Sequence, residues 1–309
     1  METPKQHYPL HILLADDGSQ HALSAVALLR DLPLLPGSTI TALAVLSPRE
    51  SSNYTALQSA LDQTTDLLKR DRVQVVTELK VGYPAETLAE FAELRHPDLI
   101  ALGAKGLRAT LGILLGGVAQ QIVEYACCPV LVVRAPYSGL WRILLVTDGS
   151  SYSQQAVEFL GDSTRCPQFP VPPGAEVRVM HVLPPIPSSD LIAQSWPAGP
   201  EVLSSLSPLA GERNKKWLEQ EECEGKEILA NAIERLASAG IQARSILLRG
   251  DAATEIIHYA KENQIDLIVA GSRGLRQVTG WLLGSVSRKL VHYAPCSILI
   301  VKGEPQAAE

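Results

Sequence analysis

The chain contains the same succession of motifs twice, and this duplication constrains its fold more than any other feature. In the first half, Gly103-Ala-Lys-Gly106 is followed after nine residues by Gly116-Gly117. In the second half, Gly271-Ser-Arg-Gly274 is followed after nine residues by Gly284-Ser285. Each copy follows a short apolar run and precedes an amphipathic stretch, so the order is strand, glycine-rich loop and helix start. Two copies in the same context indicate a duplicated unit rather than scattered glycines.

The duplication extends to both ends of each unit. Residues 12–19 match 143–150, and residues 118–134 match 286–302. A length of 309 residues with 46% hydrophobic content is sufficient for two separate cores. We expect a first domain over 1–135, a linker rich in Pro, Ser and Gly, and a second domain over 141–303.

Apolar runs alternate with helical patterns throughout both units. In the first unit the pattern predicts strands at 12–15, 39–45, 73–79, 99–102 and 130–133, and helices at 19–29, 54–70, 84–93 and 118–125. Nearly continuous apolar strands are typical of parallel sheets that are covered on both faces. Ser19 and Ser150 are the expected N-caps of the first helix in each unit. The sequence therefore predicts an α/β fold made of two Rossmann-like domains.

The second unit carries an insertion between its second and third strands, at about 184–217. The separation from Val182 to Gly271 exceeds that from Val45 to Gly103 by 31 positions. Its first part is rich in Pro and Ser and holds Leu191, Ile192 and Trp196, and a long helix is predicted over 212–239. A passive surface excursion and a lid or docking arm both fit this composition. As a lid, it is expected to fold over its own site or onto the first half.

Composition excludes several classes of protein. Lys and Arg total 27 against 33 Asp and Glu, which argues against a broad nucleic-acid-binding face. No apolar segment reaches the roughly 20 residues of a membrane span, and the first nine residues lack the apolar stretch of a signal peptide. The five cysteines form no CxxC motif, and the histidines show no metal-ligand spacing. A cytoplasmic protein with reduced thiols is expected, although a redox role for Cys127-Cys128 stays open.

The repeated residues converge on one kind of site. In an open parallel sheet, ligands bind beyond the carboxyl ends of the strands where the strand order reverses. Asp17 and Asp148 end the first strands, and the glycine loops leave the fourth strands. Gly271 and Gly274 are expected to admit close backbone approach and positive φ, and Ser285 to present a hydroxyl and an N–H to phosphate at a helix N-terminus. Lys105 and Arg273 lie in the loops, where they either approach phosphate or remain solvated.

These motifs resemble those of the universal stress protein family, and the second half resembles its ATP-binding branch in particular. The likeness rests on Gly-two-Gly-nine-Gly-Ser, on Asp-Gly-Ser after the first strand, on His181-Val182 and on Cys128-Pro129-Val130. It implies five-stranded sheets ordered 3-2-1-4-5, of the adenine nucleotide alpha hydrolase-like kind, with helices on both faces. It also implies that the last strands of the two halves pair as an internal pseudo-dimer, with a homo-oligomer as a further option.

The resemblance assigns roles in the second half. Asp148 contacts the ribose, the Val182 backbone contacts the adenine, and the glycine loop and helix start bind the phosphates. The expected nucleotide-contacting residues are Thr147, Asp148, Val182, Gly271, Arg273, Gly274, Gly284, Ser285 and Val286, with Asp17, Val45, Gly103, Gly106, Gly116 and Gly117 as their counterparts in the first half.

The first half departs from the family pattern at two places. Gly117 stands where Ser or Thr is expected, so one hydroxyl is lost. Asp16 adds a carboxylate where the second half has Thr147. Strand geometry sends Asp16 and Asp17 to opposite faces; were Asp16 to reach the site, it would repel phosphate or hold a divalent ion.

We therefore expect a stress-response regulator that binds ATP, or ADP or AMP, with Mg²⁺ as an optional companion. We expect no catalytic residues and at most weak ATPase activity. The alternatives are a slow ATPase or phosphoryl-transfer enzyme on the same fold, and a dimerising scaffold with empty sites.

Overall fold

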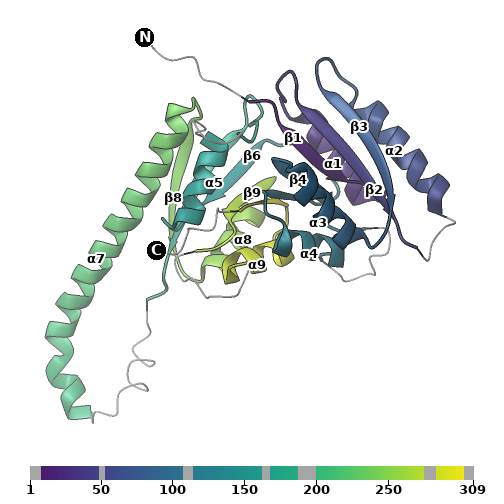
Figure 1. Ribbon diagram of the computed structural model, residues 1–309. Helices are drawn as coiled ribbons and strands as arrows, with labels where there is room; N and C mark the ends of the chain where they lie inside the picture. The colour runs from purple at the N-terminus through teal and green to yellow at the C-terminus, as the bar shows by residue number, and fades with distance from the viewer. Residues whose placement is uncertain are drawn as a thin grey trace.

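The computed structural model describes residues 8–48, 53–106, 114–161, 168–186, 200–274 and 283–302, with 200–214 described by their backbone alone. Its strands form one ten-stranded sheet in the order β3-β2-β1-β4-β5-β10-β9-β6-β7-β8 (Figure 1). Each half contributes five of these strands in the order 3-2-1-4-5. The expected fold class and strand order are confirmed.

The first half alternates strands and helices along its whole length. Its strands are β1 (His11–Ala15), β2 (Thr39–Leu46), β3 (Gln74–Val81), β4 (Leu99–Gly103) and β5 (Val130–Val133), and its helices are α1 (Gln20–Asp31), α2 (Tyr54–Leu68), α3 (Pro84–Arg95) and α4 (Gly117–Tyr125).

The second half repeats this order. Its strands are β6 (Arg142–Val146), β7 (Glu176–Leu183), β8 (Ala243–Arg249), β9 (Leu267–Gly271) and β10 (Ser297–Val301), and its helices are α5 (Ser151–Gly161), α7 (Pro200–Ser238), α8 (Ala252–Glu262) and α9 (Ser285–Tyr293).

Strands are parallel within each half and antiparallel where the halves meet. The junction is β5 against β10, with Leu131 opposite Leu299. These two leucines occupy the same position in their repeats, so a local two-fold axis passes between them. The internal pseudo-dimer through the last strands is confirmed.

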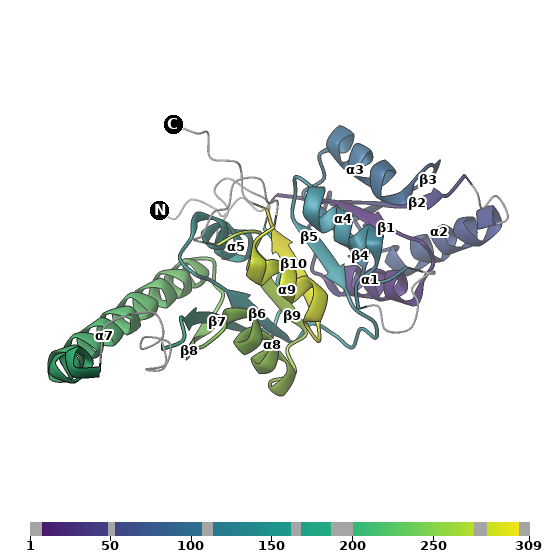
Figure 2. The same ribbon diagram turned by 90° about the horizontal axis from the view of Figure 1, so that it is seen from below.

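Side chains at alternating positions of the strands pack into two cores, one on each face of the sheet. Ile12 and Leu14 belong to the core under α1 and α2, whereas Leu13 belongs to the core under α3 and α4. The second half follows the same rule, with α5 and α7 on one face and α8 and α9 on the other. Figure 2 shows α4 and α9 on either side of the β5–β10 junction.

Short polar contacts occur at the same positions of both repeats and fix where the helices and strands begin. Ser19 Oγ accepts the Ala22 N–H and Ser150 Oγ accepts the Ser153 N–H, so both predicted N-caps are present. The aspartates that open the fourth strands hold the start of the first strands: Asp98 accepts the His11 N–H at 2.7 Å, and Asp266 accepts the Arg142 N–H at 2.8 Å. Burial raises the pKa of Asp98.

The long helix differs from the sequence prediction. It begins at Pro200 rather than at residue 212, so the helix includes part of the insertion that precedes the predicted start. At about 1.5 Å per residue its 39 residues span about 58 Å, and its N-terminal part extends beyond the sheet in Figure 1. Its C-terminal part packs on α5, β7 and β8. Leu191, Ile192 and Trp196, which were expected to bury, lie outside the described residues.

Candidate nucleotide site

At the carboxyl ends of its strands, each half has a point where the strand order reverses, and doubly wound folds form their ligand crevice at such a point. In the first half β1 lies beside β4, and in the second half β6 lies beside β9. The chain leaves these neighbouring strands toward opposite faces, so the two loops diverge at this point. We call the crevice of the first half site 1 and that of the second half site 2. Because the strands of the two halves run in opposite directions, the two sites lie at opposite ends of the strands.

An aspartate and a glycine meet in both crevices. A Cβ on Gly274 would lie 2.5 Å from Asp148 Oδ2, and a Cβ on Gly106 would lie 2.5 Å from Asp17 Oδ2. The second oxygen of each carboxylate accepts a backbone N–H, from Ser150 for Asp148 and from Ser19 for Asp17, at 3.0 Å each. The turn thus fixes each carboxylate against the glycine loop, and only glycine leaves room for it.

The first glycine of each loop has a packing role. A Cβ on Gly271 would lie 2.6 Å from the Tyr152 carbonyl oxygen, and one on Gly103 would lie 2.7 Å from the His21 backbone. These glycines let the fourth strand pass directly beneath the first turn of α5 or α1. Gly271 and Gly274 were expected to tolerate positive φ, but neither adopts it; in the Asp-Gly-Ser turns, Gly18 and Gly149 do.

The third glycine of each loop shapes the helix start. Gly284 N–H donates to the Ser272 carbonyl and Gly116 N–H donates to the Ala104 carbonyl, both at 2.8 Å. These two N–H groups therefore close the loop and do not face a ligand. The next N–H groups, at the first turns of α9 and α4, have no intrahelical acceptor, and neither helix has a side-chain cap at its N-cap glycine. Such a terminus attracts an anion.

Ser285 and Gly117 occupy the same position at these two helix starts, and both are exposed. A Cβ on Gly117 would have no heavy atom within 4 Å. The missing hydroxyl of site 1 is therefore a difference in sequence alone, because the backbone there has room for a side chain. Site 2 also has a tether that the sequence did not reveal: Ser287 Oγ donates to the Gly271 carbonyl at 2.7 Å, where the first half has Ala119.

Asp16 and Thr147 lie on the face opposite the aspartates of the sites. Asp16 is buried, accepting the Thr64 hydroxyl at 2.6 Å and the Gly18 N–H at 2.9 Å. Thr147 is buried beside Ser153, 3.1 Å between hydroxyls, and accepts the Gly149 N–H. Both side chains hold the turn from behind. The Asp16 carboxylate therefore points away from site 1, as strand geometry indicated.

The two residues expected beside the adenine, Val45 and Val182, are the penultimate residues of β2 and β7. Together with Val286 they pack at the margin of the core under α3, α4, α8 and α9. His181 is buried, and its Nδ1 lies 2.8 Å from the Thr147 carbonyl oxygen. This contact makes His181 a packed strand residue rather than a base.

The cationic side chains of the two glycine loops, Arg273 and Lys105, are not arranged to hold a phosphate between them. The guanidinium of Arg273 lies 5.6 Å from the centre of the Tyr152 ring, a cation–π contact. Lys105 is half-buried, and its carbonyl accepts the Ser19 hydroxyl at 3.2 Å. The tyrosine partner of Arg273 was not anticipated, because it comes from the helix that follows a different strand.

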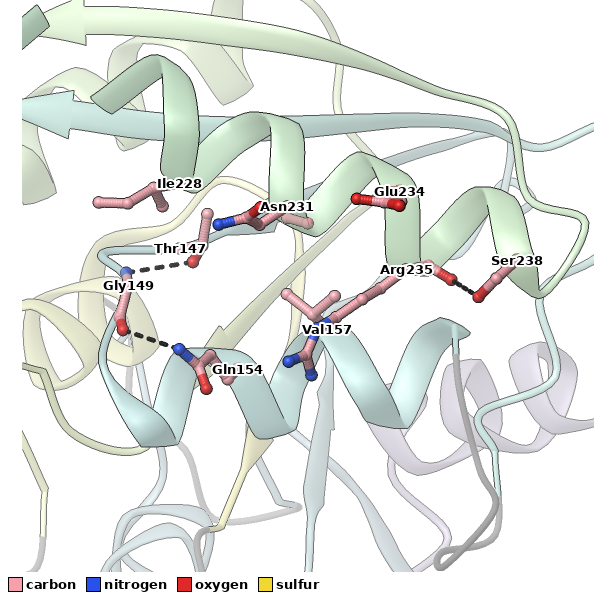
Figure 3. A pocket seen from close by; sticks show the side chains of 10 residues that line it. Thr147, Gly149, Gln154, Val157, Ile228, Asn231, Glu234, Arg235 and Ser238 are labelled. Carbon is pink, nitrogen blue, oxygen red and sulfur yellow. Dashed lines mark hydrogen bonds between the residues drawn. The ribbon is translucent and has the colours of Figure 1, made fainter. Parts of the chain in front are cut away.

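A separate cavity of about 590 Å³ opens between α5 and α7, with Thr147 and Gly149 at one end (Figure 3). Its lining is mixed, with Asn231, Gln154 and Arg235 beside Val157 and Ile228. Gln154 is held by the Gly149 carbonyl, and Arg235 pairs with Glu158 across the groove. This cavity backs onto the Asp-Gly-Ser turn but does not join site 2.

The cysteines of the described chain are thiols with different surroundings. Cys127 is exposed and Cys128 is half-buried. Burial raises the pKa of Cys128 to about 12, so it holds its proton at neutral pH and is a poor nucleophile. The raised pKa of Cys128 therefore does not support a redox role for Cys127-Cys128. Within the described ranges, no group of three His, Cys, Asp or Glu side chains is arranged to hold a metal ion. None of the helices described is both long and apolar enough to cross a membrane.

The fold and its two crevices define a duplicated, doubly wound α/β protein, and comparison with known proteins agrees. A model of the universal stress protein family matches residues 10–134 and again 141–302. The chain belongs to the universal stress protein family.

Individual relatives support the tandem arrangement. A universal stress protein of Mycolicibacterium smegmatis is 27% identical over 267 residues, covering 84% of this chain and 79% of its own. One from Bacillus subtilis is 46% identical over 79 residues, which cover 26% of this chain and 53% of that protein, so the match spans about half its length. The crystal structure of a universal stress protein from Archaeoglobus fulgidus is 18% identical, with a TM-score of 0.63, covering 96% of this chain and 98% of that one. At that identity the likeness concerns the fold alone.

Proposed function

We propose that sites 1 and 2 each bind an adenine nucleotide, with ATP as the expected ligand, and that the protein is a nucleotide-dependent regulator of a stress response. The observation that carries this proposal is the repeated approach of an aspartate to a loop glycine, Asp148 to Gly274 and Asp17 to Gly106. A carboxylate suits ribose hydroxyls, and the neighbouring helix start suits phosphate. The two features lie together at the sheet position where nucleotides are bound in doubly wound folds.

The proposed contacts in site 2 follow from this arrangement. Asp148 receives the ribose, the end of β7 at Val182 receives the adenine, and the first turn of α9 from Ser285 to Val286 receives the phosphates. Site 1 uses Asp17, Val45 and the first turn of α4 in the same way. Thr147 contributes by holding the turn rather than by direct contact, because its hydroxyl is engaged by Ser153 and Gly149.

A regulator fits the loop cations better than a phosphoryl-transfer enzyme does. Transfer requires cations fixed against the phosphates and a positioned nucleophile. Arg273 instead stacks on Tyr152, and its counterpart in the first half is a lysine.

The test is direct detection of the ligand. The protein is purified without added nucleotide, and mass spectrometry under native and denaturing conditions identifies what is released. Titration calorimetry with ATP then compares the wild type with Gly284→Val, which crowds the Arg273 backbone, 3.2 Å from the added Cβ. Gly117→Ala is the matched control, since its added Cβ meets nothing. We expect Gly284→Val to lose the tighter binding event and Gly117→Ala to keep it. Absence of both released nucleotide and binding heat in the wild type would contradict the proposal.

A further inference from the structure

Each half contributes a cationic side chain to the C-terminus of a helix in the other half. The N-terminus of each of these helices is a proposed phosphate position. Arg134, just after β5, donates from Nη2 to the Val291 and His292 carbonyls at 2.9 and 3.2 Å. Lys302, just after β10, donates from Nζ to the Val123 and Glu124 carbonyls. The acceptors are the last carbonyls of α9 and α4. Each half therefore caps the C-terminus of the helix whose N-terminus forms the other half's site.

In addition to capping α9, Arg134 makes one further contact. Its Nη1 donates to the Leu114 carbonyl at 2.8 Å, two residues before Gly116 in the loop that forms site 1. One guanidinium thus holds the site 1 loop with one nitrogen and the C-terminus of α9 with the other. Its side chain is largely desolvated, and this burial lowers the pKa of Arg134.

The geometry of arginine makes this contact a rigid link. A guanidinium is planar, and its N–H groups have fixed relative directions. A shift of the α9 carbonyls therefore rotates or releases the fork, and the Leu114 backbone, two residues before Gly116, moves with it. Helix α9 has nine residues, so it spans about 13 Å and transmits axial movement as a rod. Its N-terminus is the phosphate position of site 2.

We propose that sites 1 and 2 are coupled through Arg134, so that nucleotide in site 2 tightens binding in site 1. Phosphate at Ser285 fixes the position of α9, the α9 carbonyls fix the Arg134 fork, and the fork fixes the Leu114 loop for the second nucleotide. This inference rests on the proposed function, because it concerns the same two sites. Arg134 is a positioning residue here and touches neither nucleotide.

The chain offers a matched substitution for the test. Lys302 is the counterpart of Arg134, and a lysine retains the charge that caps a helix C-terminus. A single ammonium nitrogen lacks the fork that reaches the α9 carbonyls and the Leu114 carbonyl from separate nitrogens. Arg134→Lys therefore keeps the cap and removes the link.

Calorimetric titration with ATP on full-length protein measures the coupling. We expect two binding steps in the wild type. Arg134→Lys should leave the first, site 2 step unchanged and weaken the second step about fivefold, the lower end of typical couplings. In the Gly284→Val background, where site 2 is empty, Arg134→Lys should weaken site 1 less than twofold. Thermal melts check that every variant is folded.

The possible outcomes separate the two proposals. Equal weakening of site 1 in both backgrounds would overturn the coupling and make Arg134 a local support of the loop. Unchanged second-step affinity in Arg134→Lys, or a stoichiometry of one ATP per chain in the wild type, would overturn the coupling while leaving nucleotide binding intact. Absence of any binding step would overturn both. If Gly284→Val fails to fold, Ser285→Gly provides the second background: it lowers occupancy of site 2 and must reduce the effect of Arg134→Lys.

Discussion

At the scale of single residues, the loop glycines of one motif have three different reasons to be glycine. Gly271 avoids the backbone of α5, Gly274 avoids the Asp148 carboxylate, and Gly284 avoids the backbone of its own loop at Arg273. The sequence pattern predicts the positions but not these reasons, because each neighbour comes from a different part of the chain. Substitutions at the three positions should therefore have different effects.

Gly271→Ala should mainly reduce stability. The added Cβ meets the Tyr152 carbonyl, which belongs to a helix and cannot turn aside, so we expect a loss of about 1–3 kcal/mol in the free energy of unfolding. Gly274→Ala meets the end of a side chain, so the fold should survive while Asp148 is displaced and ATP affinity falls. Urea unfolding and calorimetry on both variants measure the two quantities. Equal loss of stability in both variants would show that the carboxylate cannot yield.

The Ser285 hydroxyl should account for a difference in affinity between the sites. A hydrogen bond to a charged group contributes about 1.5–3 kcal/mol, and exposure of Ser285 places it at the low end, about tenfold in affinity. Ser285→Gly should weaken site 2 by that factor. Gly117→Ser should tighten site 1, with Gly117→Ala as the control that adds the Cβ without the hydroxyl. If the two Gly117 variants bind ATP equally, the hydroxyl does not reach the phosphate.

At the scale of elements, the strands and short helices were predictable, whereas the long helix was not. Apolar runs and caps such as Ser19 act within a few residues, so their pattern locates β1 and α1 closely. Helix α7 is polar over much of its length, and Pro and Ser in its first turns concealed its start. The capping of α4 and α9 by cationic side chains of the opposite half was also not predictable, because Arg134 and Val291 are brought together only by the pairing of β5 with β10.

Lys302 makes one such cap sensitive to pH. Burial lowers its pKa from 10.5 to about 8, with Cys127, Cys128 and Glu124 opposing the shift and Arg273 adding to it. Between these two values the unfolded chain holds a proton that the folded chain has lost, so the contribution of Lys302 to stability rises with pH. The slope is at most about 1.4 kcal/mol per pH unit.

The comparison with Lys302→Met isolates this contribution. The stability of the wild type relative to the variant should increase by about 1–2 kcal/mol between pH 7.5 and pH 9.5, at no more than the slope above. Groups that titrate in this range away from Lys302 are common to both proteins and cancel. Urea unfolding at the two pH values gives the difference. A constant or falling difference would show that Lys302 is not desolvated as its contacts indicate.

At the scale of the whole molecule, the β5–β10 junction makes one sheet of two domains. The order of strands within each half and the pairing of the last strands followed from the repeat and from likeness to known relatives. Leu131 and Leu299 face each other across the axis at matching positions of the repeat. The junction therefore has the register that two identical halves would adopt.

The second half produced alone, as residues 141–303, should form a homodimer through β10. Its uncovered edge is apolar and rich in β-branched residues, and pairing Leu299 with Leu299 of another copy satisfies the same ladder. Light scattering after size exclusion should give twice the mass of the fragment. The full chain, measured alongside, shows whether any larger assembly needs surfaces other than this edge. A monomeric fragment would mean that the junction depends on contacts such as the Arg134 cap.

The local two-fold axis also determines how such a protein can change over time. In a dimer of identical chains every substitution is made twice, so both sites gain or lose a group together. Joining two copies in one chain removes that restriction. Site 2 can keep the Ser285 hydroxyl while site 1 carries Gly117, and only one half carries the long helix. The covalent link thus lets selection adjust the two proposed ligand sites independently, within an architecture that remains symmetric.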